Sequence, residues 1–543
     1  MLFNKDVMEE GALSQELPAK TAENQRHSIL DQTESDRLTT SQLTFDDVNT
    51  KSVEPSDLLP AIGSLSGLIN SNRELLTKAV RGNTRDFYVA IRLLNSAFRY
   101  YYGCYPLLKD GSSFREDIVD FVNFGADLLR GHTDKLEETV NSSENSYISE
   151  EALQSADWLA RIDAEFAGKF NSDGKAMDLL LRYFDKAAGW SKIKPQYRYW
   201  YPDVPVLRTI FEFGSSSQAE KGKSMVVDLL KHTDPLVRQA GIRMIAGCGM
   251  SPRKELINSY MGDIVSSVFG VDGRKMAEVW GDTTFKKSMS ADEEKRRQFL
   301  FFRDNLEQLS QLEERRPGIG KVLQSEFGIN DFSRYPLEFL IAQYDQKDSK
   351  VNLPNGVIVY PQSDWNGAYT GIDPKEMLER FFDQMKGKYR ITVWETGNTL
   401  GLVKALNKTR QKYGRITLAV IGGHGEKDNI MFGRPEPATQ FSDKRKVLQQ
   451  EEIRRRGASA IKLAFADNST VILESCSTGQ LGGIGQEISE IAGVKIIAPA
   501  KDASIAGIKV NERKDGESDF NVFYFGENEE LVATQVYKSG ILQ

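Results

Sequence analysis

The spacing of hydrophobic and polar positions changes part-way along this chain. From about residue 59 to 330, apolar residues recur at the three- and four-residue intervals of a helix face, as they do between Leu68 and Phe98. Further helices are expected at 114–130, 150–168, 174–188, 204–213 and 218–232. After about residue 350, short apolar runs alternate with helical stretches. We therefore expect an all-α region followed by an α/β domain at 350–543.

The alternation after residue 350 predicts a mostly parallel sheet with helices on both faces. Strands are expected at 356–360, 391–394, 416–421, 471–473 and 494–498, with helices near 374–386, 399–412, 452–465 and 481–491. A β-hairpin is expected from 521–525 and 531–537. The stretch 318–355, which includes Pro336 and a polar run, is interpreted as a junction.

The two ends of the helical region have different patterns. Residues 1–58 are polar and have no sustained period, which is typical of a mobile tail or pro-segment. The run 233–242 resembles the start of a helix in a HEAT-type repeat, with Asp234 as the cap and Pro235 in the first turn. One copy without a clear period does not predict a solenoid.

Two of the predicted strands lead into glycine-containing turns that carry reactive side chains. The strand at 416–421 is followed by Gly-Gly-His-Gly, which contains His424, and the strand at 471–473 is followed by Glu-Ser-Cys-Ser-Thr-Gly, which contains Cys476. Open α/β sheets bind ligands at the carboxyl ends of their strands. His424 and Cys476 are therefore expected to lie near each other at that edge.

A cysteine and a histidine in this arrangement fit nucleophilic catalysis. A thiol is only a few per cent ionised at neutral pH, and histidine is the usual base that activates it. Backbone N–H groups near Gly423, Gly425 and Cys476 are candidates for an oxyanion hole. The simpler alternative is a buried core cysteine and a turn histidine.

These two motifs resemble those of the caspase-like cysteine peptidases, which include caspases, metacaspases, clostripain, gingipains, separase and CHAT domains. The run Val-Ile-Leu-Glu-Ser-Cys-Ser-Thr-Gly looks closest to the CHAT and metacaspase versions, and the resemblance covers about the last third of the chain. It implies a caspase-like α/β fold, with His424 as general base or acid and Cys476 as nucleophile. The caspase Gln-Ala-Cys signature is absent, so aspartate specificity is not implied.

The resemblance also implies a preference for basic residues. Metacaspases and clostripain carry an acidic residue two positions before the cysteine, where this chain has Glu474, and Asp364 resembles a second acidic pocket residue of metacaspases. Two carboxylates in a cleft would bind Arg or Lys by charge-assisted hydrogen bonds. Asp502 is a third candidate substrate-binding residue. The alternative for Glu474 is an ion pair or cap at the strand exit.

Composition narrows the classes of partner. The 543 residues carry a formal net charge of −7, which argues against nucleic acid or an anionic membrane as the main partner. Neither a signal peptide nor a membrane span is expected, and three cysteines fit a reducing compartment, so a cytoplasmic protein is predicted. No metal site or cofactor is expected, because the other cysteines and histidines lack partners at ligand spacing and are interpreted as structural. These residues are Cys104, Cys248, His132 and His232.

The function expected from these observations is that of a cysteine endopeptidase, which cleaves protein substrates after Arg or Lys with a His–Cys dyad. The helical region would regulate it and could bind a regulatory protein. The rival is a catalytically silent interaction or scaffold protein, and a third interpretation is a non-proteolytic hydrolase or acyltransferase with the same dyad. The basic insert at 434–456 is either an activation cleavage site or a solvated loop.

Overall fold

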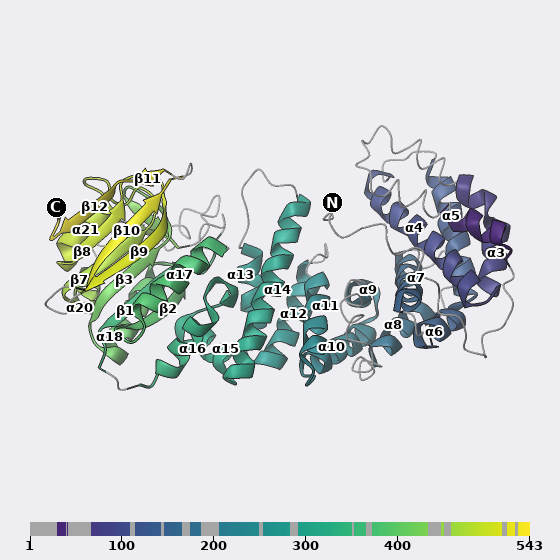
Figure 1. Ribbon diagram of the computed structural model, residues 1–543, viewed down its shortest axis with the longest axis horizontal. Coiled ribbons are helices and arrows are strands. Elements are labelled where there is room, and N and C mark those ends of the chain that lie inside the picture. The colour runs from purple at the N-terminus through teal and green to yellow at the C-terminus, as the bar shows by residue number, and fades with distance from the viewer. Residues whose placement is uncertain are drawn as a thin grey trace. The chain divides into compact units, whose positions relative to one another are not determined.

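The fold was analysed in a computed structural model, which describes residues 30–39, 41, 67–108, 114–142, 146–165, 174–185, 206–248, 254–282, 291–349, 352–364, 372–432, 447–449, 458–512, 518–526 and 530–543. The chain divides into two compact units, Met1–Arg253 and Lys254–Gln543 (Figure 1). The first unit is helical in its described residues, and the second joins helices to α/β structure. The expected change from helices to an α/β pattern therefore lies inside the second unit.

The helices of the first unit follow the apolar periodicity of the sequence. They are α3 (Arg73–Arg81), α4 (Thr84–Leu108), α5 (Phe114–Arg130), α6 (Thr133–Ser142), α7 (Ser146–Glu165), α8 (Lys175–Asp185), α9 (Val206–Phe213), α10 (Ser216–Leu230) and α11 (Pro235–Cys248). Helix α7 is central, because it packs against α4, α5, α6, α8 and α9. The expected cap of α11 is present: Asp234 Oδ1 accepts a 2.9 Å hydrogen bond from the Leu236 N–H. The HEAT-type resemblance of this segment stays a prediction.

Part of the expected N-terminal tail is ordered. Residues 32–39 form a helix, and Leu38 is fully buried. The side chain of Arg37 donates to the Ser71 carbonyl at 2.7 Å, and Lys78 of α3 forms an ion pair with Glu34. These residues therefore pack against the start of the helical region, whereas the interpretation of 1–58 as a tail or pro-segment stays a prediction. The rest of 1–58 lies outside the described residues.

The segment interpreted as a junction contains packed helices of the second unit. The helices that precede the sheet are α12 (Lys254–Phe269), α13 (Gly273–Asp282), α14 (Ala291–Arg315), α15 (Ile319–Phe327), the 3₁₀ turn η5 (Phe332–Arg334) and α16 (Leu337–Gln346). Phe332, Tyr335 and Phe339 are buried among them. Gly318 and Gly328 flank α15 in the left-handed conformation typical of helix ends.

The α/β part is built on a seven-stranded sheet with the order β13-β12-β8-β7-β3-β1-β2. Its strands are β1 (Asn355–Pro361), β2 (Arg390–Thr396), β3 (Ile416–Gly422), β7 (Phe465–Glu474), β8 (Lys495–Pro499), β12 (Thr534–Lys538) and β13 (Ile541–Leu542). Neighbouring strands from β2 to β8 pair in parallel, and β12 and β13 pair antiparallel at one end. The predicted mostly parallel α/β sheet is confirmed.

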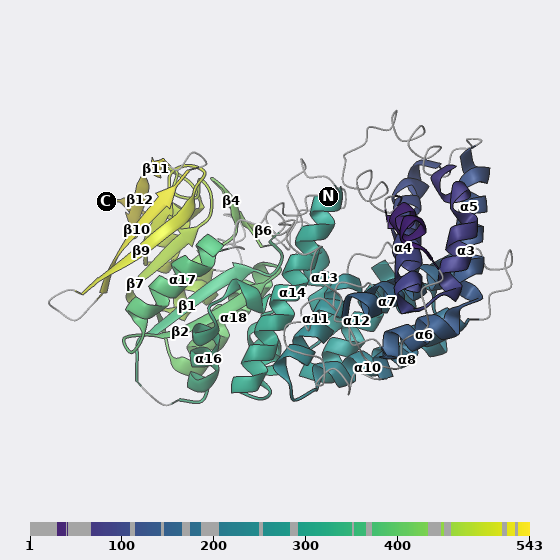
Figure 2. The ribbon, with the colours of Figure 1, turned by 45° about the vertical axis from the view of Figure 1, so that its right-hand side comes forward.

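Helices α17 (Ile372–Met385), α18 (Thr399–Tyr413), α20 (Ala458–Ala464) and α21 (Ile484–Ala492) connect the parallel strands. Helices α18, α20 and α21 pack in a row along the sheet, whereas α17 packs against the extra strand β9 (Ser504–Glu512) (Figure 2). Strands β10 (Ser518–Phe525) and β11 (Leu531–Val532) pair as the expected hairpin and form a second small sheet with β9. The last expected strand differs, because β12 leaves the hairpin and joins the main sheet.

Two glutamine side chains act as strand partners at the edges of these sheets. At β2, the Gln343 side chain accepts from the Val393 N–H at 2.8 Å and donates to the Val393 carbonyl at 3.1 Å. At β9, the Gln384 side chain accepts from the Val510 N–H at 2.9 Å and donates to the Ile508 carbonyl at 3.0 Å. Each amide thus satisfies a backbone donor and acceptor that no strand within the described residues covers at that position.

None of the helices in the described parts of the chain combines the length and the apolar character that crossing a bilayer requires.

Candidate active site

Three parallel strands of the main sheet end beside one another where the strand order reverses. Within the order β2-β1-β3-β7-β8, the chain runs outward in one direction from β1 to β2 and in the other from β3 to β8. Ligands of open α/β sheets bind at this switch point, beyond the carboxyl ends of the strands. Asp364 follows β1, His424 follows β3 and Cys476 follows β7. The topology therefore brings these three side chains to one edge of the sheet.

The histidine and cysteine motifs are in direct backbone contact. A Cβ atom added at Gly425 would lie 2.1 Å from Ser475 Oγ and 2.7 Å from the carbonyl oxygen of Cys476. The Gly423 N–H donates to the Glu474 carbonyl at 3.2 Å, which continues the pairing of β3 with β7. A glycine next to His424 thus allows the turn after β7 to approach within van der Waals distance.

Gly425→Ala is expected to lower the free energy of unfolding by about 1–3 kcal/mol, because the added methyl group collides with the backbone of the cysteine turn. Gly507→Ala is the matched control, since a Cβ at Gly507 meets nothing within 4 Å. Removal of this glycine should leave stability unchanged or raise it by up to about 1 kcal/mol. Denaturant unfolding of both variants measures the difference, and equal stabilities would contradict the close contact.

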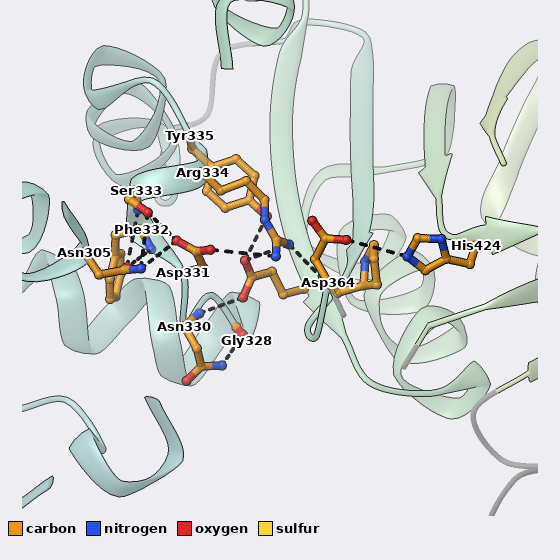
Figure 3. A network of polar contacts seen from close by, with 12 residues as sticks. Asn305, Gly328, Asn330, Asp331, Phe332, Ser333, Arg334, Tyr335, Asp364 and His424 are labelled. Atoms are coloured by element: carbon orange, nitrogen blue, oxygen red, sulfur yellow. Dashed lines mark hydrogen bonds and ion pairs between the residues drawn. The ribbon is translucent and has the colours of Figure 1, made fainter. Parts of the chain in front are cut away.

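His424 lies against a buried carboxylate. Its Nε2 is 3.6 Å from Asp364 Oδ1, and Figure 3 shows the carboxylate directed at the imidazole. Asp364 is 1% exposed and His424 is 9% exposed. The separation suits an ion pair with a protonated imidazole and is slightly longer than a hydrogen bond, as catalytic contacts without substrate often are. Asp364 can therefore orient the imidazole of His424.

Glu474 is tied to the first strand by a tyrosine. Tyr360 donates from its hydroxyl to Glu474 Oε2 at 2.7 Å, although the two residues lie on strands separated by β3. Gly422 of β3 pairs with Glu474. The glycine has no side chain to stand between the tyrosine and the glutamate, so the hydroxyl reaches across the middle strand.

The environment of Glu474 favours its neutral form. Burial raises the pKa of Glu474 to about 7, and the negative charge of Asp364 acts in the same direction, against the lowering effect of the Tyr360 hydrogen bond. Glu474 is 4% exposed. The structure therefore brings together two of the three predicted pocket residues, Asp364 and Glu474, close enough for the charge of one to act on the other.

The turn that carries Cys476 is held from its other side by the segment after β8. Ser477 has a φ of 58°, which is uncommon for a residue with a side chain. Its N–H donates to the Lys501 carbonyl at 3.0 Å and its hydroxyl donates to Asp502 Oδ1 at 2.7 Å. Cys476 is partly exposed, with its Sγ 3.8 Å from the Ala503 carbonyl. Asp502, the third predicted pocket residue, thus lies beside the cysteine turn.

The hydrogen bonds of the sheet limit which amides can serve as an oxyanion hole. The Gly423 N–H is occupied by the Glu474 carbonyl, so the expectation that Gly423 contributes is not supported by this arrangement. Its position in the sheet is the physical reason, because the pairing of β3 and β7 extends one residue past β3. Gly425 and Cys476 remain the candidate donors.

The remaining predicted residues are held locally or lie outside the description. His132 Nδ1 contacts the Leu128 carbonyl at 2.8 Å, and His232 Nδ1 accepts from the Asp234 N–H at 3.0 Å. The side chains of Cys104 and Cys248 lie outside the described residues, as does the basic insert except for β6 (Val447–Gln449). Strand β6 forms a small antiparallel sheet with β5 (Asn429–Met431) and β4 (His424–Glu426), which the sequence analysis missed.

Arg334, Tyr335 and Glu395 are the other residues at this site that sequence reasoning missed. Arg334 donates to the Pro361 carbonyl at the end of β1, and Tyr335 donates to Glu395 Oε1 at 3.0 Å. All three are buried. Their only local signal was Glu395 itself, a buried acidic residue directly after the expected strand at 391–394.

Comparisons with known proteins do not assign a family. No family model and no curated protein matches this chain. Among solved structures, the chain is similar to the crystal structure of an engineered protein, with 13% sequence identity over 58% of this chain and 86% of that one, at a TM-score of 0.17. A likeness this weak supports no statement about fold or function.

Proposed function

We propose that this protein is a cysteine endopeptidase with a caspase-like domain, which cleaves protein substrates after Arg or Lys and is regulated through its helical region. The observation that carries this proposal is the convergence of Asp364, His424 and Cys476 at the strand-order reversal of a parallel sheet. The sequence resemblance to caspase-like peptidases supports His424 as the general base or acid and Cys476 as the nucleophile.

In the proposed mechanism His424 accepts the Cys476 thiol proton, and the thiolate attacks the carbonyl carbon of the scissile peptide bond. Asp364 stabilises the imidazolium that results. Amides of the Gly425 and Cys476 segments bind the oxyanion. His424 then gives its proton to the leaving amine as the C–N bond breaks. Water, deprotonated by His424, hydrolyses the thioester, releases the carboxylic acid and restores the thiol.

The proposed preference for basic residues rests on the charge around Glu474. Asp364 and Glu474 form a buried acidic pair, and the pKa of Glu474 is raised to about 7 by burial and then by Asp364. A guanidinium or ammonium group would stabilise the ionised form of Glu474 and form charge-assisted hydrogen bonds with both carboxylates. The same pair would disfavour an acidic substrate residue.

A pH-dependent affinity follows from the raised pKa of Glu474. A cation binds the ionised carboxylate, and ionisation increases as the pH rises through about 7. Binding of N-acetyl-arginine amide to Cys476→Ala protein should therefore strengthen about tenfold between pH 6 and pH 8 in calorimetric titrations. In Glu474→Gln/Cys476→Ala protein, binding should be weaker and nearly independent of pH. An unchanged pH dependence would show that another group controls the affinity.

The function itself is tested by incubating the full-length protein with a peptide library and reading the cut sites by mass spectrometry. A parallel sample is alkylated with iodoacetamide, and peptide mapping measures the modification of each cysteine. Cuts after Arg or Lys should disappear in proportion to alkylation of Cys476. Cuts after other residues would reject Glu474 as the specificity group. Absence of cleavage, or cleavage that survives complete alkylation, would reject the proposed peptidase.

A further inference from the structure

The end of β1, which carries Asp364, rests on a buried arginine from the segment before the sheet. Arg334 belongs to η5, and its side chain is fully buried. Its Nη1 donates to the Pro361 carbonyl at 2.8 Å, three residues before Asp364, and lies 3.4 Å from Glu395 Oε1. Figure 3 shows Arg334 next to Asp364, with His424 on the far side of the aspartate. Arg334 thus contacts the backbone that places Asp364.

Arg334 is surrounded by negative charge. Its Nη2 lies 3.8 Å from Asp331 Oδ2. Burial disfavours the charged form of Arg334, but Tyr335, Glu395, Asp331 and Asp364 together raise its pKa above the ordinary value. A guanidinium in this position is therefore charged throughout the pH range in which proteins are folded, and it attracts the carboxylate of Asp364.

The arginine is itself fixed by helix α14. Asn305 Nδ2 donates to Asp331 Oδ1 at 2.7 Å, and Gln308 Nε2 donates to the Tyr335 carbonyl at 2.6 Å, so both ends of η5 are tied to the helix. The segment just before η5 is also tied to β2, because Glu395 accepts a hydrogen bond from the Asn330 N–H at 2.7 Å. These contacts restrict the backbone at Arg334, and the fixed backbone limits the positions that the Arg334 side chain can adopt.

We propose that Arg334 is a positioning residue of the active site, which sets the place of Asp364 and, through Asp364, the orientation of His424 toward Cys476. This inference rests on the dyad of the proposed function and adds a residue that lies outside the two sequence motifs. Arg334 does not touch the substrate or the reacting atoms. Its effect reaches the chemistry only through the end of β1 and the Asp364 carboxylate.

A purely structural role for Arg334 makes a different prediction. If the arginine only filled and stabilised the core, its substitution would act equally whether or not residue 364 carries a charge. If it acts through Asp364, its effect requires that carboxylate. A double-mutant cycle between Arg334 and Asp364 separates the two roles, because only residues that act through each other deviate from additivity.

The readout is the rate at which chloroacetamide alkylates Cys476 in the full-length protein, measured by peptide mapping from pH 5.5 to 9.5. This rate reports the thiolate that His424 stabilises and does not require cleavage of any peptide. Arg334→Lys keeps a buried charge but has a single nitrogen, so it cannot reach Pro361 and Glu395, which Nη1 contacts, together with Asp331, which Nη2 approaches. At pH 6 we expect Arg334→Lys to slow alkylation about tenfold. Above pH 9, where thiols ionise without help, the difference should shrink to less than about twofold.

In the Asp364→Asn background the same Arg334→Lys change should alter the pH 6 rate by less than about twofold. Arg334→Met should give the same pattern with a larger effect, and Arg334→Lys carries the test if the methionine variant does not fold. Arg316→Lys, at an exposed ion pair with Asp345, is the matched control and should react like wild type. An equal effect of Arg334→Lys in both backgrounds, or no effect in the wild-type background, would overturn the proposal. Rapid alkylation without peptide cleavage would leave the positioning role standing and reject only the peptidase.

Discussion

Replacement of Cys476 by alanine is expected to lower kcat/KM for peptide cleavage by at least about 10³-fold, because the thiol supplies the bond to the substrate carbonyl. His424→Ala should cause a loss of similar size, since the thiol then lacks its base and the leaving amine lacks its acid. Residues that act as one unit are not additive, so the double variant should be no worse than either single one. Steady-state kinetics on an arginine-containing peptide measure all three.

His132→Ala is a suitable control for the histidine variant. His132 bonds to a carbonyl of its own turn in the first unit, and its loss should leave kcat/KM within about twofold of wild type. A His424→Ala protein that keeps a tenth or more of the activity would contradict the dyad. A Cys476→Ala protein with unchanged cleavage would point to a contaminating protease or to a different nucleophile.

Replacement of Asp364 by asparagine is expected to lower kcat by about 10²-fold or more, because the amide cannot stabilise the imidazolium 3.6 Å away and can bind the wrong tautomer of His424. Asp364 also belongs to the acidic pair with Glu474, so KM for arginine substrates should rise in the same variant. Measurement of kcat and KM on paired substrates with Arg or Gln before the cut separates these effects. The orienting role lowers kcat for both substrates, whereas the pocket role penalises only the arginine substrate.

Asp519→Asn provides the matched control for that charge loss. Asp519 pairs with Lys495 at a partly exposed position, where an ion pair contributes about 0–1 kcal/mol to stability, so kinetics should be unchanged. If Asp364→Asn retained wild-type kcat on the glutamine substrate, the contact with His424 would have no catalytic role.

The candidate reactive residues at the strand ends could be predicted from the sequence, because their signal is local. The strands before His424 and Cys476 contain buried apolar runs at 418–421 and 471–473, and the polar residues that follow such a run mark the carboxyl edge of the sheet. Asp364 and Glu474 were singled out by the resemblance to metacaspases, and both also lie at strand ends. Their meeting follows from the order of the strands, which an alternating pattern of strands and helices constrains strongly.

The residues that support the site could not be predicted, because their burial depends on contacts far along the chain. Tyr360 bonds to Glu474, which lies 114 residues later, and only the register across Gly422 brings them together. Arg334 lies in a short 3₁₀ turn with no periodic pattern, within the stretch 318–355 that Pro336 and a polar run suggested was a junction. Strand β9 was missed because a register shift near Gly507 interrupts its alternation.

The side-chain amides of Gln343 and Gln384 have a consequence for how this domain avoids association with its own copies. An uncovered strand edge is a template for intermolecular β-pairing and for aggregation. Here the outer edge of β2 and the edge of β9 beside α17 each present a glutamine from a packed helix in place of open backbone groups. A single residue on each helix thus takes the place of a neighbouring strand. Each glutamine occupies a backbone donor and acceptor that a strand from another copy would need, and neither side chain takes part in the proposed chemistry of the site.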